Sequence, residues 1–428
     1  MHFLSAVGVA YKYFIKVAMP LKQIEKILTV KLNDLKAKGT LKGEEKVITG
    51  IREAKDGFGP RCLLAGQGEK EFLRMNSNSY LGLSLNKDVI QAEEETARKF
   101  GTGPGAVRFI SGTYEPHLEL EKRLARFHNR ESAMVFSSAY STVMGVLPQF
   151  ISEETLVVSD ELNHNCIINA IRLSKPAKKA IYRHLDMREL ERILKENIGQ
   201  AKKTVVVTDG IFSMRGDYAP LDRIADICRK YESGYEEGVI TLVDDSHGVG
   251  AFGKTGRGVE EYTNTKADIL VATLGKALGV NGGYVVSGKI VIDYLRETAP
   301  FYIYSNPITP SEAAAALKSL EILDSPEGIK LLERLQRLTA HLREGLKQLG
   351  YETLHGEHPI VPLMVRDTQK TSQMASYLFD NGILCTGLNF PVVPKGDEEI
   401  RFQVSATHTE KDIDYLIDVL KRFKVTAL

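Results

Sequence analysis

The feature that most limits the fold of this chain is a series of short apolar runs separated by amphipathic helical stretches. Helical spacing of apolar residues is clear at 118–127 and 221–230, between runs that have the length of buried strands. Strands that are apolar throughout need cover on both faces, so the pattern predicts an α/β fold with a largely parallel sheet. The runs lie at 134–136, 156–159, 204–208, 240–244, 269–273 and 284–287.

The length of 428 residues exceeds what one hydrophobic core usually supports, so two lobes are expected. Strand signals fade after residue 306, where helical runs begin and are followed by a second alternation of strands and helices. A Thr409–Asp412 capping box is expected to open the last helix. The predicted parts are an N-terminal arm and helix at 1–75 packing with the small domain, a large domain at 76–308 and a small α+β domain at 309–428.

Composition narrows the class of partners. The chain has 56 basic and 55 acidic side chains, a balance that favours neither nucleic acid nor an anionic membrane as partner. Its four cysteines are scattered without a CxxC pair, which indicates reduced thiols and a cytoplasmic protein. Lysines interrupt the apolar first eighteen residues, so this segment is not expected to be a signal peptide; an upstream start, with Met19 beginning the native chain, or a docking arm are the alternatives.

Three segments carry groups that suit a pyridine cofactor with a phosphate. Lys276 follows an apolar strand in a glycine-rich turn, where a desolvated amine can lose its proton and form a Schiff base. Asp244 and His247 stand at the end of another strand, where an acid can pair with a protonated ring nitrogen. Ser137–Tyr140 lies between a strand and a helix, where N–H groups and hydroxyls can hold a phosphate. Each segment alone has an ordinary structural explanation, but together they predict pyridoxal 5′-phosphate (PLP) chemistry.

At these residues the chain resembles the α-oxoamine synthase family of fold-type-I PLP enzymes, and the resemblance runs from about residue 35 to the C-terminal helix. It implies a large domain with a mostly parallel seven-stranded sheet, a smaller α+β C-terminal domain and a homodimer. The matching segments are NSYLGLS (78–84), VRFISGT (107–113), DELNHNCII (160–168), TDGIFSMRGD (208–217), VDDSHG (243–248), TLGKALG (273–279) and VVPKGDEEIRFQVSATHT (392–409).

The resemblance also implies the role of each site residue. Lys276 would carry the cofactor, Asp244 would pair with its ring nitrogen, and His247 and Ser213 would face its ring hydroxyl. His164 would stack on the ring and touch the incoming carbonyl, whereas Asn78 and Arg401 would hold the amino acid's carboxylate. The phosphate would be bound by Ser138, Ala139, Tyr140 and Thr273, with Ser305 and Asn306 contributed by the partner subunit.

Within the family, the VRFISGT segment and the unhydroxylated Val392 favour glycine C-acetyltransferase, which joins glycine to acetyl-CoA to give 2-amino-3-oxobutanoate. The alternative is another α-oxoamine synthase that uses alanine or serine with a longer acyl-CoA, such as 8-amino-7-oxononanoate synthase. Two departures from the family pattern bear on acyl choice, a shortened GVNGG loop after Lys276 and an inserted segment at 233–238.

Two further alternatives belong to other classes. A PLP aminotransferase is disfavoured by His164, because aminotransferases usually stack an aromatic residue there, and a non-catalytic scaffold by the presence of every expected cofactor residue. No metal site is expected. His355 and His358 flank Glu357 in a loop without further ligands, and both are interpreted as solvated.

Overall fold

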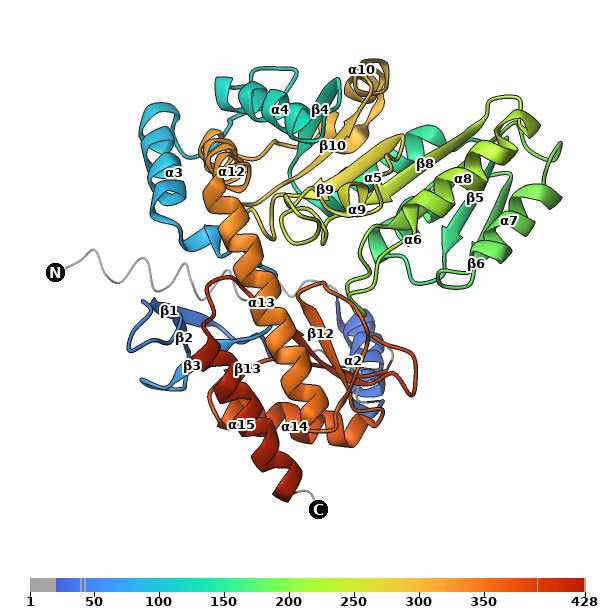
Figure 1. Cartoon of the computed structure of the whole chain (residues 1–428). Coiled ribbons are helices and arrows are strands. Elements are labelled where there is room, and N and C mark those ends of the chain that lie inside the picture. Colours follow the sequence, from blue (N-terminus) through green and yellow to red (C-terminus); the bar gives the residue numbers. More distant parts are fainter. Residues whose placement is uncertain (1–20, 39–40, 42–43, 391, 427–428) are drawn as a thin grey trace.

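The computed structural model describes residues 21–38, 41, 44–390 and 392–426, in two lobes joined by a long helix (Figure 1). The predictions for the first eighteen residues lie outside the described part. The upper lobe in Figure 1 holds the large sheet, and the lower lobe holds two smaller sheets with helices beside them.

The large sheet has seven strands in the order β4-β10-β9-β8-β7-β5-β6. All neighbours are parallel except β10, which runs antiparallel to both β4 and β9. The predicted α/β class, parallel sheet and strand number are therefore confirmed. The strands are β4 (Ser132–Phe136), β5 (Thr155–Asp160), β6 (Lys178–Tyr182), β7 (Lys203–Asp209), β8 (Val239–Asp244), β9 (Ile269–Thr273) and β10 (Gly283–Ser287).

One strand of this sheet was not recognised from the residues. β6 is an edge strand of sequence KKAIY, and only Tyr182 in it is buried. Lysines on an edge strand discourage pairing with another chain, and they also remove the apolar run by which the other strands were found. The seventh strand was implied by the family resemblance alone.

Helices cover both faces of the sheet. On one face α5 (Ala139–Val146), α6 (Asn165–Leu173) and α10 (Lys289–Thr298) bury a core with side chains from β4, β7 and β9. On the other face α7 (Met187–Glu196) and α8 (Leu221–Tyr231) pack at one end, and α4 (Glu115–Phe127) with α12 (Pro310–Leu323) at the other. This two-sided cover is the reason why the inner strands contain continuous apolar runs.

A single long helix, which follows α12, connects the two lobes. α12 packs against α3 (Lys87–Phe100) and α4, both in the large lobe, and α13 (Pro326–Gln348) then runs down into the small lobe (Figure 1). The predicted boundary at 308/309 assigned α12 to the small domain, but its contacts place it with the large one. The polar–apolar pattern of α12 predicts that the helix is buried, but it does not identify the element against which the helix packs.

The small lobe contains an antiparallel sheet in the order β11-β12-β15-β14. The expected capping box opens α15, since Asp412 Oδ2 accepts the Thr409 N–H at 2.8 Å and Thr409 Oγ1 accepts the Asp412 N–H at 3.3 Å. The elements are β11 (Glu352–Thr353), β12 (Ile360–Met364), β14 (Thr386–Leu388), β15 (Glu399–Gln403), α14 (Thr368–Asp380) and α15 (Glu410–Thr426).

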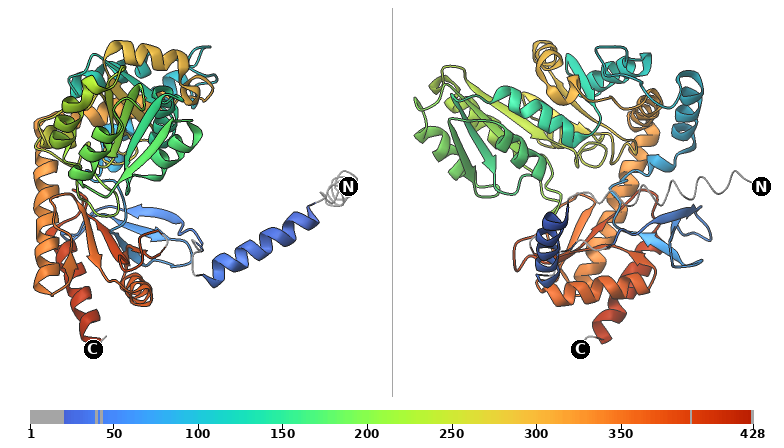
Figure 2. Two further views of the ribbon diagram at one scale, coloured as in Figure 1. Left: turned by 90° about the vertical axis from the view of Figure 1, so that its right-hand side faces the viewer. Right: turned by 180° about the vertical axis from the view of Figure 1, so that it is seen from behind.

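The N-terminal part joins the small lobe through a sheet that was not predicted. β1 (Ile48–Arg52), β2 (Arg61–Leu64) and β3 (Glu71–Arg74) form a meander, and β13 (Ile383–Leu384) pairs parallel with β3. The predicted N-terminal helix exists as α2 (Lys22–Ala37), but it does not lie against the body. None of its residues is buried, and Figure 2 shows it standing away from both lobes.

Short helical segments complete the chain, namely η1 (Leu83–Leu85), η2 (Leu147–Phe150), η3 (Glu232–Gly234), α9 (Val259–Tyr262) and α11 (Pro300–Ile303). Among the described residues, no helix combines the length and apolarity needed to span a bilayer.

Candidate active site

Several of the predicted site residues, Lys276, Asp244 and His164 among them, converge at the edge of the large sheet where the parallel strands end. β7, β8 and β9 finish side by side there, with Asp209 paired to Asp244 in register. A cavity of about 50 Å³ opens at this edge. Its walls are formed by Ala139, Tyr140, His164, Cys166, Asp209, Ile211, Ser213, Asp244, Ser246, His247 and Lys276.

Lys276 lies in the turn that follows β9. The turn is fixed by Thr273, whose Oγ1 accepts the Gly275 N–H at 3.0 Å and donates to the Gly282 carbonyl at 3.1 Å. Burial lowers the pKa of the Lys276 amine, although the nearby carboxylates of Asp244 and Asp209 oppose this shift. A larger fraction of the amine is therefore neutral and nucleophilic than for a solvated lysine. The contact of Thr273 with a phosphate stays a prediction, because its hydroxyl is used within the turn.

Asp244 is a buried carboxylate at the end of β8. Its Oδ1 accepts the Ser246 N–H at 3.1 Å, and its Oδ2 lies 3.6 Å from the thiol of Cys166. Asp209 stands beside it on β7, and burial together with the charge of Asp244 raises the pKa of Asp209 well above its usual range. A neutral Asp209 adds no second negative charge, so Asp244 is suited to hold a cationic ring nitrogen.

His164 caps the N-terminus of α6 next to these acids. Its backbone N–H donates to Asp209 Oδ2 at 3.0 Å, which ties the loop to β7. The Cys166 N–H lies 3.2 Å from Nδ1 and donates to it. With Nδ1 acting as acceptor, the proton of the neutral ring is assigned to Nε2. Partial burial lowers the pKa of His164, which favours this neutral form with an N–H to donate.

His247 is buried one turn beyond Asp244 and has two partners that sequence reasoning missed. The Tyr80 hydroxyl is 2.7 Å from its Nδ1, and burial raises the pKa of Tyr80, so the phenol is the donor. His358 donates from Nε2 to the His247 carbonyl at 2.8 Å. His358 was interpreted as solvated, which is wrong: it is fully buried, and burial lowers its pKa to about 3. His355 is exposed as expected.

The predicted phosphate cradle forms the N-terminus of α5. Ser138 is its N-cap, with Oγ accepting the Ser141 N–H at 3.1 Å. The N–H groups of Ala139 and Tyr140 lie in the first turn, where no carbonyl within the helix can accept them, so they are available to an anion. Gly283 on β10 allows the first residue of α5 to pack closely against this strand, since a Cβ at Gly283 would lie 2.3 Å from the Ala139 nitrogen.

Asn78 and Arg401, which are predicted to hold a carboxylate, are connected through hydrogen bonds of neighbouring residues. Arg401 on β15 donates from Nη1 to the Ser213 carbonyl at 2.8 Å. Asn78 Oδ1 accepts a short hydrogen bond from Gln403, two residues further along the same strand. Within the described residues, the buried Nε of Arg401 has no partner. The guanidinium therefore retains capacity for an acid ligand.

Ser305 and Asn306 are not part of this cavity. They follow α11, next to Tyr304, which is 78% exposed. Their predicted contribution from a partner subunit stays a prediction.

The structure also shows site residues that sequence reasoning did not assign. Asp209, Cys166, Ile211 and Ser246 all line the cavity, although each lies inside a segment that was recognised. Asp209 could have been found from strand order, because the last residue of β7 must lie beside the last residue of β8. The burial of Cys166 and the contact of Tyr80 with His247 depend on tertiary packing, and no local pattern announces them.

The two departures from the family pattern fall in different places. The GVNGG loop begins directly behind Lys276, with Gly279 at φ 72° and packed against the Ser84 backbone. The inserted segment 233–238 precedes β8, at the strand end opposite Asp244. It is anchored there by Tyr235, whose hydroxyl donates to the Leu194 carbonyl at 2.6 Å. An influence of this insertion on acyl choice is therefore not supported.

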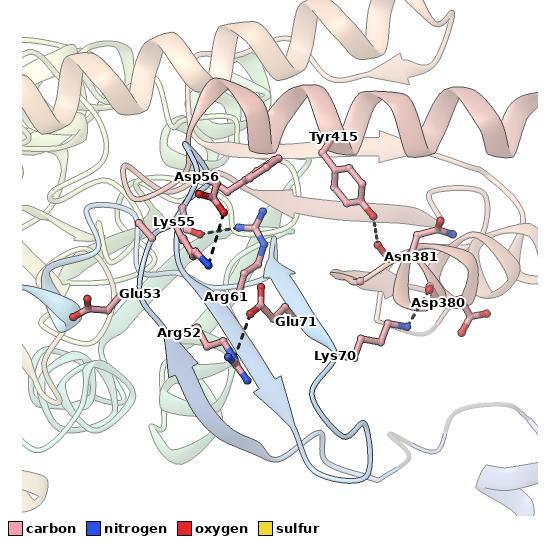
Figure 3. Close-up of a pocket in the computed structure, with 14 residues that line it drawn as sticks. Arg52, Glu53, Lys55, Asp56, Arg61, Lys70, Glu71, Asp380, Asn381 and Tyr415 are labelled. Carbon is pink, nitrogen blue, oxygen red and sulfur yellow. Dashed lines mark hydrogen bonds and ion pairs between the residues drawn. The ribbon is translucent and has the colours of Figure 1, made fainter.

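A wider concavity of about 1030 Å³ lies between β1, β2, β3 and α15, and its lining is mostly charged (Figure 3). Its cations have partners. Arg61 pairs with Asp412 at 2.6 Å, and Figure 3 shows Arg52 paired with Glu71 and Lys70 donating to the Asp380 carbonyl at 2.9 Å. No cluster of metal-binding side chains occurs in the described part of the chain.

Residues 70–420 match the family model Aminotransferase class I and II. An 8-amino-7-oxononanoate synthase of Thermosipho melanesiensis is 38% identical over 358 residues, covering 82% of this chain and 88% of the relative. One of Symbiobacterium thermophilum is 39% identical over 390 residues, covering 90% and 94%. The chain belongs to the α-oxoamine synthase family. Serine palmitoyltransferase from S. paucimobilis, solved with a bound PLP–myriocin aldimine, superposes with a TM-score of 0.84 at 26% identity, covering 96% of this chain and all of that one.

The protein is thus a PLP-dependent acyltransferase of this family, and its site fits the cofactor. The buried lysine with a lowered pKa, the acid on the neighbouring strand and the free N–H groups of α5 match the aldehyde, ring nitrogen and phosphate of PLP. Within the described residues, the buried hydroxyl of Ser246 in the cavity wall has no partner either. The relatives named here are 8-amino-7-oxononanoate synthases, so the sequence comparison favours the alternative branch over glycine C-acetyltransferase.

Proposed function

We propose that the protein joins alanine to a seven-carbon dicarboxylic acyl thioester and releases 8-amino-7-oxononanoate. The names of the relatives support this choice. The carbon balance identifies the substrates: alanine supplies the amine with the last two carbons of the product and loses its carboxyl carbon as CO2. The acyl group supplies the other seven carbons, and coenzyme A leaves as the free thiol.

Glycine with acetyl-CoA is the second candidate. The VRFISGT segment at 107–113 and the unhydroxylated Val392 favour it. Val392 is 58% exposed, beyond β14, so no contact of its own argues for either branch.

The observation that carries the proposal is the meeting of Lys276, Asp244 and His164 around one cavity. An amine that can form a Schiff base, an acid for a ring nitrogen and a neutral imidazole donor are the groups that this condensation needs. The aminotransferase alternative needs no donor for an oxyanion, which is the role that Nε2 of His164 is suited to fill.

When bound, PLP supplies an electron sink for the bond that is broken at the amino acid's Cα. Asp244 holds a proton on the ring nitrogen, which keeps that sink effective. Lys276 Nζ, once released, would be the base that takes the Cα proton, because burial lowers the pKa of this amine and so raises its neutral fraction. Without Asp244 the electron sink would be weaker, and without Lys276 the proton would have no base to receive it.

The remaining residues bind and orient. Arg401 and Asn78 hold the amino acid's carboxylate, so that the bond to be broken stands perpendicular to the ring. His164 donates Nε2–H to the oxygen of the thioester carbonyl as negative charge develops there. Burial lowers the pKa of His247 and keeps its ring neutral, whereas Tyr80 fixes the ring and His358 fixes the backbone of His247, with the ring proton assigned to Nε2.

The substrate pair is tested by release of free coenzyme A from PLP-loaded protein. Alanine with heptanedioyl-CoA is expected to give at least about tenfold higher kcat/KM than glycine with acetyl-CoA, since a misfit acyl or methyl group costs about 1–3 kcal/mol. Serine and acyl chains of intermediate length complete the panel. Faster release from glycine and acetyl-CoA would reverse the order of the candidates, and a pyridoxamine spectrum without release would refute both.

We also propose a homodimer with shared active sites, in which Ser305 and Asn306 of each subunit complete the other's phosphate site. Exposed apolar side chains near Ser305 support an interface there, since Arg108 lies over the Tyr302 ring at 5.4 Å and so brings the exposed residues after it toward the same region. Phe109 and Ile110 are each 65% exposed, and Tyr304 is 78% exposed.

Mixing two defective variants tests this sharing. Lys276→Ala and Ser305→Ala subunits are each expected to form homodimers with weak or absent cofactor binding. A mixed dimer has one doubly defective site and one intact site if Ser305 acts across the interface. PLP affinity equal to wild type in half of the sites is then expected by equilibrium titration. Mixed dimers that bind no better than the Ser305→Ala homodimer would contradict the proposal, as would a fully active monomer.

A further inference from the structure

A histidine outside the cavity is held between two acids. His184, in the loop after β6, has Nδ1 3.0 Å from Asp160 Oδ1 and Nε2 3.2 Å from Asp217 Oδ2. Its side chain is 13% exposed, and its ring stands edge-on to Phe212 at 4.4 Å between centroids. An imidazole can donate from both nitrogens only when both are protonated. The two contacts with acids therefore indicate that His184 is protonated on both nitrogens and carries a positive charge.

The two acids belong to the loops that carry site residues. Asp160 ends β5 and starts the loop leading to His164, and its Oδ1 also accepts the Leu162 N–H at 2.9 Å. Asp217 closes the loop that contains Ser213, where the Phe212 N–H donates to the Asp217 carbonyl at 3.0 Å. His184 is thus a side-chain link between the loop after β5 and the loop after β7.

We propose that His184 is a positioning residue, a cationic clasp that sets the loop of His164 and the loop of Ser213 relative to each other. The second loop continues the effect into the small lobe, because the Ser213 carbonyl accepts Arg401 Nη1 at 2.8 Å. The clasp thereby aligns the ring-stacking residue with the carboxylate-binding one. This inference rests on the proposed roles of His164, Ser213 and Arg401.

The backbone next to His184 adopts a strained conformation. Leu185 has φ 57°, a left-handed conformation that a residue with a branched side chain rarely adopts. In this conformation its N–H donates to the second oxygen of Asp160, Oδ2, at 3.0 Å. Such strain persists only where surrounding contacts hold it, and here the contact is with the same acid that His184 binds.

The charges around the clasp favour the cation at neutral pH. Burial alone lowers the pKa of His184, but its hydrogen bonds and charge pairing with Asp160 and Asp217 outweigh burial and raise the pKa to about 9. Arg215 Nε faces Asp217 from within its loop at 2.9 Å, and the Glu161 carboxylate accepts the His184 backbone N–H at 2.8 Å. Next to His184, Arg183 forms ion pairs with both Asp186 and Glu189.

The direction of the pH effect follows from the raised pKa. The clasp is fully charged below the ordinary histidine pKa of about 6.5 and loses its stabilising charge as pH rises through about 9. At neutral pH the two loops are joined, and well above pH 9 they are expected to part.

Hydrogen exchange of the PLP-loaded protein tests the clasp without any acyl substrate. In wild type, protection of peptides spanning 160–165 and 210–218 is expected to fall about tenfold from pH 7 to pH 10, after correction for intrinsic exchange. The reason is that the buried Asp160 and the partly buried Asp217 lose a charged partner. His184→Gln is expected to show the low protection already at pH 7, with no further pH step, and to bind PLP about tenfold more weakly. His341→Gln is the matched control, since His341 also pairs with one acid, Asp414, but on the exposed surface of the small lobe.

Asp217→Asn provides a second variant that keeps the imidazole, and it is expected to move the exchange midpoint of wild type to lower pH. Unchanged protection of both loops in His184→Gln at pH 7, or a midpoint unmoved by Asp217→Asn, would overturn the clasp. Because neither readout needs condensation, failure of the coenzyme A release assay bears on the proposed function and leaves the clasp standing.

Discussion

Replacing Lys276 with alanine is expected to lower turnover roughly 10⁴-fold and to remove the visible absorption band of lysine-bound PLP. The amine has two roles that no neighbour can take over, since it binds the cofactor covalently and moves the Cα proton. The described residues that line the cavity include no second lysine. Coenzyme A release and the visible spectrum of the reconstituted protein measure the two losses separately.

Stability distinguishes a chemical loss from misfolding in this variant. A buried ammonium is costly to desolvate, so the apo form of Lys276→Ala is expected to unfold at no lower temperature than wild type. Lys289→Ala serves as control, because Lys289 is exposed at the start of α10 and pairs with Asp293. An alanine variant that keeps the band, or more than about one hundredth of the turnover, would exclude Lys276 as the Schiff-base residue.

The centre of the fold could be predicted because its signals are local. β5, β7 and β9 are buried along almost their whole length, and each contains an uninterrupted apolar run. Asp244 and Lys276 follow neighbouring parallel strands, so their proximity follows from strand order alone. The convergence of these residues at one edge of the sheet was therefore within reach of the sequence.

The parts that could not be predicted depend on a partner elsewhere in the chain. His358 stands in a polar loop that looks solvated, yet it is buried, because its ring N–H can donate a hydrogen bond to the His247 carbonyl. His184 belongs to a segment with no apolar pattern, and its raised pKa comes from Asp160 and Asp217, which lie 24 and 33 residues away in sequence. In α2, by contrast, an amphipathic pattern is present although none of its residues is buried.

Replacing Asp244 with asparagine is expected to lower turnover roughly 10²- to 10³-fold while some PLP is retained. The amide cannot hold a proton on the ring nitrogen by charge, and preorganised electrostatic groups of this kind are typically worth about 3–4 kcal/mol in a transition state. Asp245→Asn is the matched control on the next residue. Burial raises the pKa of Asp245 well above its usual range, so an amide resembles its neutral form, and its acceptor role toward the Val259 N–H at 2.7 Å is kept.

The same substitution also gives a signed pH effect on Lys276. Burial lowers the pKa of this amine while the charge of Asp244 raises it, so removal of that charge is expected to lower the amine pKa further. The neutral amine then predominates at lower pH, and the pH profile for Schiff-base formation by apoprotein and PLP should move toward acid in Asp244→Asn. A profile that stays in place, or normal turnover in the purified variant, would mean that Asp244 does not face the cofactor and that the site needs reassignment.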